Sequence, residues 1–151
     1  MRSILAVLAF VAGPSGAMAS GGISCEVVDD GAEIVIGGGM TRGMGSALFS
    51  FSASTTILDA TVEDDLRRTE FERGHLPQYW FDGETLKLRL YREREGDAPH
   101  GYVEMLVETA LNETTSTFAG TYAISTYNMT GASGGEARKT ETAGEIVCSV
   151  E

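Results

Sequence analysis

The chain holds only two cysteines, and they stand near its opposite ends in matching frames. Residues 23–27 read ISCEV and residues 146–150 read IVCSV, so both follow Ile-x-Cys-x-Val. Alternate side chains of a β-strand lie on one face, which places each cysteine in the middle of the apolar face of a terminal strand. We therefore expect a Cys25–Cys148 disulfide that joins the first strand to the last, either side by side in one sheet or across two packed sheets.

The first residues predict export. Arg2 precedes an apolar run at residues 4–12 that is too short to span a bilayer, and residues 17–19 (AMA) form a small-x-small cleavage site. We interpret residues 1–19 as a signal peptide and residues 20–151 as one exported domain, in the periplasm or outside the cell. Exported chains usually oxidise a cysteine pair, so a disulfide is favoured over two buried free thiols. No later stretch is long and apolar enough to predict a membrane span in the mature chain.

Strand patterns dominate the rest of the chain. Apolar and polar side chains alternate in many short runs separated by turn signals, which is typical of an all-β domain. We predict a single-domain antiparallel β-sandwich or small β-barrel of about seven or eight strands, with the first and last strands linked by the disulfide. Two of the runs lie at residues 46–53 and 58–62. Residues 60–71 also fit a helix in part, and residues 37–45 and 127–144 are expected to be long loops.

One hairpin can be specified by its register. Residues 85–91 (TLKLRLY) and 102–108 (YVEMLVE) flank a polar loop. If Tyr91 lies opposite Tyr102, the apolar side chains of both strands share one face, and Arg89 lies opposite Glu104 on the other. A slip by one residue would turn the apolar set outward, so the facing of this hairpin is strongly specified.

The charge of the chain excludes some classes of partner. Lys and Arg number 11 against 22 Asp and Glu, a net charge of −11, and loss of Arg2 with the signal peptide makes it more negative. Nucleic-acid binding needs a basic surface, so no nucleic-acid partner is expected. Adhesion to anionic lipid is disfavoured for the same reason. Only residues 67–94 are locally basic, which indicates either an anion site or an ionic complement to the acidic flanks.

Catalytic and metal motifs are weak. Ser133 lies in a Gly-x-Ser-x-Gly pattern, but a nucleophile elbow needs a later histidine, and both His75 and His100 come earlier in the chain. The glycines of residues 37–45 match neither a dinucleotide fingerprint nor a P-loop, and a flexible connection is favoured there over an anion nest that uses Arg42. CxxC, HExxH and EF-hand patterns are absent from the sequence, so no metal site and no cofactor are predicted.

Acidic side chains cluster at residues 29–30 and 63–65. Such clusters can bind Ca²⁺ weakly when their oxygens converge. A solvated turn is the favoured interpretation of both clusters, because the ordered spacing of a calcium loop is missing.

The most informative stretch is residues 75–83 (HLPQYWFDG), which holds the only tryptophan. Its aromatic side chains either plug one end of the β core, which is the favoured interpretation, or form a stacking platform for a sugar or another flat ligand. If a ligand site exists, we expect Trp80, Tyr79 and His75 to form it and Arg73 to supply charge.

These observations favour a non-catalytic exported β-domain that binds a small ligand or an exported protein partner. One alternative is a small hydrolase that acts through carboxylates and a loop histidine, although the acidic residues single out no pair for that chemistry. A further alternative is an envelope or inhibitor-like partner of another exported protein. An enzyme is the less favoured class.

Overall fold

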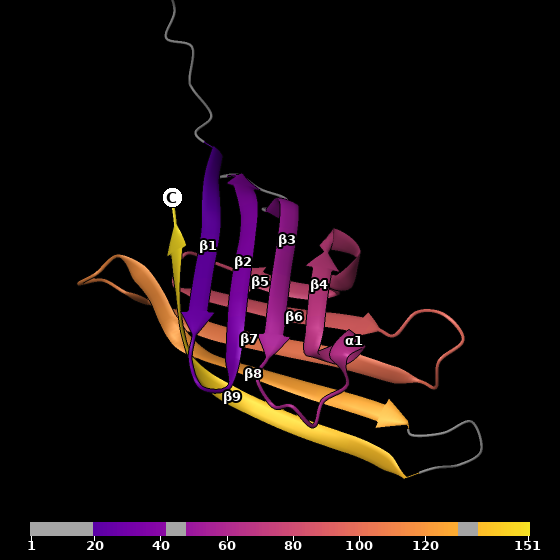
Figure 1. Cartoon of the computed structure of the whole chain (residues 1–151). Coiled ribbons are helices and arrows are strands. Elements are labelled where there is room, and N and C mark those ends of the chain that lie inside the picture. Colours follow the sequence, from indigo (N-terminus) through magenta and orange to yellow (C-terminus); the bar gives the residue numbers. More distant parts are fainter. Residues whose placement is uncertain (1–19, 42–47, 130–135) are drawn as a thin grey trace, which may run out of the picture.

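The computed structural model describes residues 20–41, 48–129 and 136–151, which form one antiparallel sheet of nine strands in the order β4-β3-β2-β1-β9-β8-β7-β6-β5 (Figure 1). The predicted signal peptide, residues 1–19, lies outside the described residues. The elements in chain order are β1 (Ser20–Val28), β2 (Ala32–Thr41), β3 (Leu48–Ile57), α1 (Asp64–Arg67), β4 (Arg68–Glu72), a 3₁₀ turn η1 (Arg73–His75), β5 (Gln78–Phe81), β6 (Thr85–Glu93), β7 (Gly101–Asn112), β8 (Thr117–Met129) and β9 (Ala137–Val150).

The sheet curls on itself into a half-barrel. Strands β1–β4 form one layer and cross β5–β9 at a steep angle (Figure 1). Strand β9 belongs to both layers, because it pairs with β8 from Ala137 to Cys148 and its last residues, from Val147 to Val150, pair with β1. Strands β4 and β5 are the two edges of the sheet. The prediction of an antiparallel all-β domain is confirmed, with nine strands in place of seven or eight.

The core lies between the two layers. Alternate side chains of the strands point into it, as their buried and exposed pattern shows. Tyr79, Phe81 and Val150 are partly buried against its margin. The largest fully buried side chains are Tyr122, Phe71, Ile34, Ile36, Ile57, Leu86, Leu90, Met105, Ile124, Ile146, Val103 and Val107.

The two cysteines form the predicted disulfide. Cys25 of β1 and Cys148 of β9 are register partners, with their Cα atoms 4.1 Å apart, and both side chains are buried. The first and last strands are therefore neighbours in one sheet. This answers the question that the matching frames left open, since equal positions on adjacent antiparallel strands present both sulfurs to the same face.

The β6–β7 hairpin has the predicted facing but not the predicted register. Leu88 lies opposite Val107 and Tyr91 lies opposite Glu104, a shift of two residues from the pairing of Tyr91 with Tyr102. A shift of two preserves the face of every side chain, so the apolar pattern alone does not distinguish the two registers. Arg89 still reaches Glu104, with its Nε 2.6 Å from Oε1, but does so diagonally.

The segment after β3 corrects two predictions. Residues 58–62 are not a strand, and the helix predicted over residues 60–71 is confined to Asp64–Arg67. Thr69 and Phe71 are buried on alternate positions of β4, so the period of two prevails from Arg68 onward. Val62 and Leu66, which suggested a helical face, are both buried, but Val62 lies in the turn before α1 and Leu66 in the four-residue α1 itself.

The two predicted long loops are largely strand. Residues 37–41 belong to β2, residues 127–129 to β8 and residues 137–144 to β9. Apart from Glu136, the remaining parts of these segments, which include Arg42 and Ser133, lie outside the described residues. Polar, glycine-rich composition predicted loops here, but long curved strands whose outer face meets solvent accept the same composition.

One glycine of the Gly37–Gly39 run has a clear packing role. Gly39 pairs with Phe49 of β3, and a Cβ atom at Gly39 would lie 2.2 Å from the Phe49 ring. The ring therefore covers the glycine backbone, and the β2–β3 register shifts between Gly37 and Gly39. Ser50, beside Phe49, has a φ of 48° and completes this irregular region.

Candidate binding surface

The outer face of strands β5–β7 carries an open groove of about 530 Å³. Side chains alternate along these strands, so every second residue faces solvent. The six outward side chains that line the groove form two rows across the strands, Trp80–Lys87–Glu108 and Gln78–Arg89–Leu106. The groove thus combines one large aromatic ring with aliphatic, amide and charged groups.

Trp80 is 59% exposed, yet its orientation is held. The indole Nε1–H donates to Oδ2 of Asp82 at 3.0 Å. Asp82 also accepts the backbone N–H groups of Glu84 and Thr85, in a turn where Gly83 has a φ of 92°. These hydrogen bonds stabilise the ionised carboxylate and hold the pKa of Asp82 far below its usual value; the bond from Trp80 is the main cause, and the two backbone N–H groups add to it. An ionised Asp82 therefore fixes the indole edge.

The basic side chains of the groove are already paired with carboxylates. Lys87 Nζ lies 3.3 Å from Oε1 of Glu108, its register partner on β7. Arg89 Nε lies 2.6 Å from Oε1 of Glu104 on the same strand. Both cations therefore lean toward β7 and away from β5, the strand that bears Trp80.

The four residues predicted for a ligand site take different positions. Trp80 faces solvent, and Tyr79 points to the other face and packs at the margin of the core. The Arg73 guanidinium lies over the Tyr79 ring, 5.1 Å from its centroid, and donates to the carbonyl of Leu76. Arg73 and Tyr79, which were predicted to share a site, are in contact. Tyr79 and Trp80 are neighbours in β5, so their side chains point to opposite faces of the sheet.

The His75 side chain binds the backbone of its own 3₁₀ turn, η1. Its Nδ1 accepts the backbone N–H of Glu72 at 3.0 Å, and its ring meets the edge of Phe71. The lining of the groove includes Tyr79 and Trp80 but neither Arg73 nor His75.

The favoured interpretation of the aromatic stretch as a core plug is wrong for Trp80, because that ring lies on the outer face. It holds in part for Tyr79 and Phe81, which are partly buried against the core. The Phe81 ring contacts Phe118, with centroids 5.6 Å apart.

Sequence reasoning missed the groove residues outside β5. The sequence placed all four of these residues, Lys87, Arg89, Leu106 and Glu108, in the β6–β7 hairpin. It predicted the outward facing of Arg89 and Glu108 correctly but gave no role to the exposed Leu106. The missing signal was the pairing of β5 with β6, which sets Trp80 beside Lys87. A run of four residues after a turn is weak evidence for a strand, so this pairing is hard to predict from the sequence.

A second aromatic cluster lies on the same outer face. Tyr102 of β7 and Tyr127 of β8 are register partners whose rings stack with centroids 5.4 Å apart and an interplanar angle of 9°. Tyr91 and His100 contact these rings. Because the ring faces contact one another, cross-strand packing accounts for this cluster.

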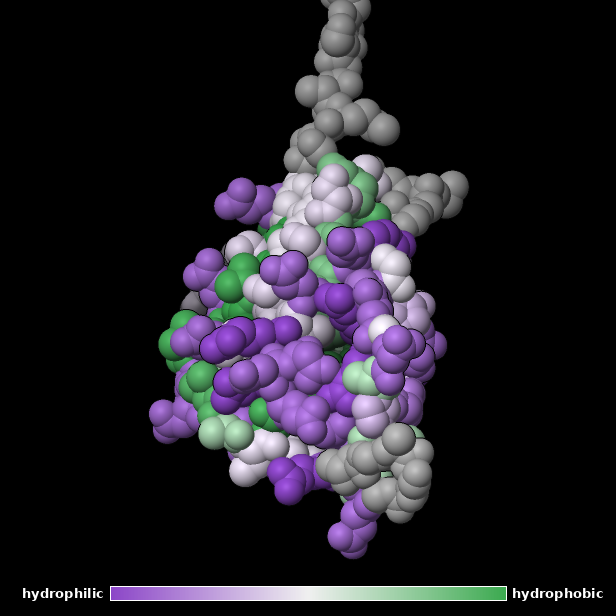
Figure 2. Space-filling model, turned by 45° about the vertical axis from the view of Figure 1, so that its right-hand side comes forward, coloured by the Kyte–Doolittle hydropathy of each residue, from purple (hydrophilic) through white to green (hydrophobic). Residues whose placement is uncertain are grey.

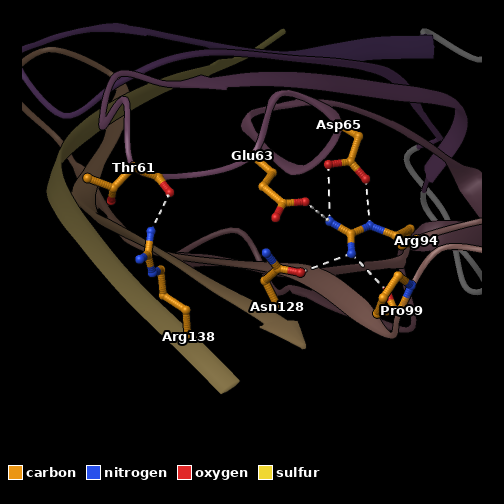
Figure 3. Close-up of polar contacts among 7 residues, drawn as sticks. All are labelled: Thr61, Glu63, Asp65, Arg94, Pro99, Asn128 and Arg138. Carbon is orange, nitrogen blue, oxygen red and sulfur yellow. Dashed lines mark hydrogen bonds and ion pairs between the residues drawn. The ribbon is translucent and has the colours of Figure 1, made fainter. Parts of the chain in front are cut away.

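The acidic cluster at residues 63–65 is not simply a solvated turn, because part of it is bound by Arg94, whose side chain is only 5% exposed. The guanidinium contacts the carboxylates of Glu63 and Asp65, and it donates to Asn128 Oδ1 and the Pro99 carbonyl (Figure 3). These contacts raise the pKa of Arg94, with the Asp65 hydrogen bond as the main cause.

Figure 2 shows that the flank bearing α1 is mainly hydrophilic. The paired acids of residues 63–65 contribute to that flank. Among the described residues, no group of three His, Cys, Asp or Glu side chains is placed to hold a metal ion.

In comparisons with known proteins, no protein-family model, no curated protein and no solved structure matches the chain. Among the residues that the structure describes, no helix is long and apolar enough to cross a membrane.

Proposed function

We propose that this chain is a non-catalytic, exported β-domain that binds a small ligand on the outer face of β5–β7. The observation that carries the proposal is Trp80, a largely exposed ring that is fixed by Asp82 beside an open groove. A single exposed apolar side chain is common on protein surfaces, but Trp80 and the exposed Leu106 lie in the same groove, and an aromatic ring with aliphatic and polar groups in one groove is typical of binding sites. The ordered indole loses little conformational freedom when a ligand packs on it.

Export is supported by two independent features. The sequence begins with the charge, apolar run and small-residue pattern of a signal peptide. The Cys25–Cys148 disulfide is consistent with an oxidising compartment. Together they favour the periplasm or the extracellular space.

A non-catalytic role is supported by the placement of the histidines. His75 binds within its own turn, and His100 contacts the tyrosine cluster, so neither lines the groove. A hydrolase built on a loop histidine would need one of them beside the bound substrate.

The test uses Trp80 as a natural probe, since it is the only tryptophan of the chain. Intrinsic fluorescence is recorded while the folded protein is titrated with a broad set of small molecules, and native mass spectrometry records any bound mass. We expect at least one compound to shift the emission and to be recovered chemically unchanged. Recovery of a cleaved product, lost in His75→Ala or His100→Ala, would instead establish the hydrolase alternative.

An exported protein partner is the second candidate, because β5 is an edge of the sheet beside the same groove. It predicts a complex with a protein mass and a shift in Trp80 emission without any small bound mass. A protein that binds without altering Trp80 would place the functional surface elsewhere.

A further inference from the structure

We propose that the ligand of the Trp80 groove is a neutral saccharide, with one pyranose ring packed on the indole. This inference rests on the proposed binding function and adds the chemical class of the ligand. It follows from three properties of the groove: a flat exposed ring, internally paired charges, and hydrogen-bonding groups of both kinds at the rim.

The first property is the flat ring. The hydrogen bond to Asp82 uses the N–H group at the edge of the indole, so Asp82 does not cover the flat faces of the ring. An aromatic face carries partial negative charge and attracts the weakly positive C–H groups of a ligand. The axial C–H groups of a pyranose form such an apolar, slightly positive patch, so its ring can lie flat on the indole.

The second property is charge balance. The net charge of the whole chain is −11, but the two bases of the groove are offset by carboxylates within contact distance, in the pairs Lys87–Glu108 and Arg89–Glu104. A charged ligand would have to compete with these pairs for its counter-charge. A neutral ligand leaves them intact, so the balance favours an uncharged molecule.

The third property is the mixture of donors and acceptors. Lys87 and Arg89 donate, Glu108 accepts, and the Gln78 amide does both. A sugar hydroxyl also donates and accepts, so adjacent hydroxyls can bridge a cation and the carboxylate paired with it. An apolar ligand would leave these groups unused, and a peptide would require the backbone edge of β5 rather than the face of Trp80.

The groove is open to solvent along the sheet, so the bound ring can be one unit of a longer chain. Strand β5 ends at the turn of Asp82 and Gly83, where the described residues leave the edge of the sheet without a further strand. An oligosaccharide can therefore extend past the bound ring without displacing part of the fold.

The experiment compares three probes with the intact mature protein: neutral glucose oligosaccharides with β-1,4 and α-1,4 linkages, an anionic oligogalacturonate, and an uncharged extended peptide. Calorimetry and Trp80 fluorescence give the affinities at low and high salt. We expect a neutral oligosaccharide to bind with an affinity that salt leaves unchanged, because no ion pair forms or breaks.

The variants test the role of the ring. Trp80→Ala is expected to weaken binding about tenfold, and Trp80→Phe less, because phenylalanine keeps a smaller flat face. Val28→Ala, which changes an exposed side chain at the end of β1, is the matched control and should bind as the wild type does. Thermal melting confirms that each variant is folded.

The outcomes separate the two proposals. Binding of the anionic sugar or the peptide, with no binding of any neutral saccharide, would overturn the ligand class and leave the binding function in place. If no neutral saccharide binds and the broad screen of small molecules also leaves Trp80 emission unchanged, both proposals fail. Equal saccharide affinity in wild type and Trp80→Ala would move the sugar site away from the groove and overturn the inference.

Discussion

The two layers of the half-barrel meet on two sides, and different interactions hold them together on each side. On one side, β1 and β9 pair directly, and the buried Cys25–Cys148 bond joins them. On the other side, β4 and β6 have no strand ladder between them, and long cationic side chains reach across. Arg92 donates to the backbone carbonyl of Glu70 at 2.7 Å, and Arg94 binds the segment around α1. We call the first side the seam and the second the opening.

This difference shows how a sheet can enclose a core without closing into a barrel. The seam relies on backbone pairing, a covalent bond and apolar packing, which salt hardly affects. The opening relies on charged hydrogen bonds, which depend on the guanidinium groups and their partners. The following predictions test whether the two sides contribute as differently as their chemistry indicates.

The largest effect is expected at the seam. The disulfide closes a loop with a sequence separation of 123 residues. Its removal in the Cys25→Ala/Cys148→Ala double variant should lower the free energy of unfolding by about 4–5 kcal/mol, mainly because the unfolded chain gains freedom. Urea unfolding at pH 7 measures the loss, and reductant should then destabilise the wild type but not the variant. A loss below about 1 kcal/mol would show that backbone pairing alone holds the seam.

The next effect is expected at the opening. Arg94→Met removes five hydrogen bonds and leaves Asn128 and the Pro99 carbonyl without this partner. Glu63 and Asp65 are about half exposed, so water can hydrate them once Arg94 is gone, and this limits the effect. We expect the free energy of unfolding to fall by about 2–3 kcal/mol.

Arg94→Lys is the matched control for this prediction. It keeps the charge but not the planar fork, and should recover only part of the loss. Both variants are measured by urea unfolding at two salt concentrations. Full stability in Arg94→Met would mean that the apolar core holds the opening without its charged contacts.

A smaller effect is expected where β8 contacts the β1–β2 turn. The buried Tyr122 hydroxyl donates to Asp29 Oδ2 at 2.7 Å, and Asp29 Oδ1 accepts the N–H groups of Gly31 and Ala32. Tyr122→Phe should lower the free energy of unfolding by about 1–2 kcal/mol. Tyr91→Phe, which removes a hydroxyl on the outer face, is the control and should cost less.

The same pair predicts a dependence on pH. The Tyr122 bond lowers the pKa of Asp29, so its contribution is present above the unfolded value of about 4 and is lost as the pH falls through the folded pKa. Burial raises the pKa of Tyr122, so its contribution is present below about pH 10 and is lost as the pH rises further. Tyr122→Phe should flatten both limbs of the curve of stability against pH. Limbs as steep as those of the wild type would assign the dependence to other groups.

The disulfide of the seam was predictable from the sequence, but the direct pairing of β1 with β9 was one of two arrangements left open, and the contacts of the opening were not predicted. Matching Ile-x-Cys-x-Val frames and a period of two determine which face each terminal strand presents, and these are local properties. Pro99 lies in the same β6–β7 loop as Arg94, and Asn128 lies on β8 beside the start of β7. Glu63 and Asp65, by contrast, come from the segment around α1, which only the curl of the sheet brings to Arg94.

The candidate site divides in the same way. Trp80 was identified because it is the only tryptophan in a short aromatic run. Lys87 and Glu108 were not identified as site residues. Lys87 lies beside Trp80 because β5 pairs with β6, and Glu108 lies beside Lys87 because of a hairpin register that the apolar pattern cannot distinguish from one shifted by two residues. Tyr79 and Trp80 were grouped as neighbours, although successive side chains of a strand face opposite ways.

The smallest effect separates the two arginines of the opening. Arg92 makes one close hydrogen bond to the Glu70 carbonyl and a longer contact of 3.4 Å with Glu95, and about a third of its side chain is exposed. Water can replace the lost donor at an edge strand, so Arg92→Ala should lower the free energy of unfolding by about 0.5–1 kcal/mol, well below the effect of Arg94→Met. Hydrogen exchange of the β4 amides should rise more than that of β1, because the released edge opens locally before the whole sheet unfolds. Equal protection of β4 in the variant and the wild type would mean that Arg94 and the core alone position this edge, and that the opening depends on a single buried guanidinium.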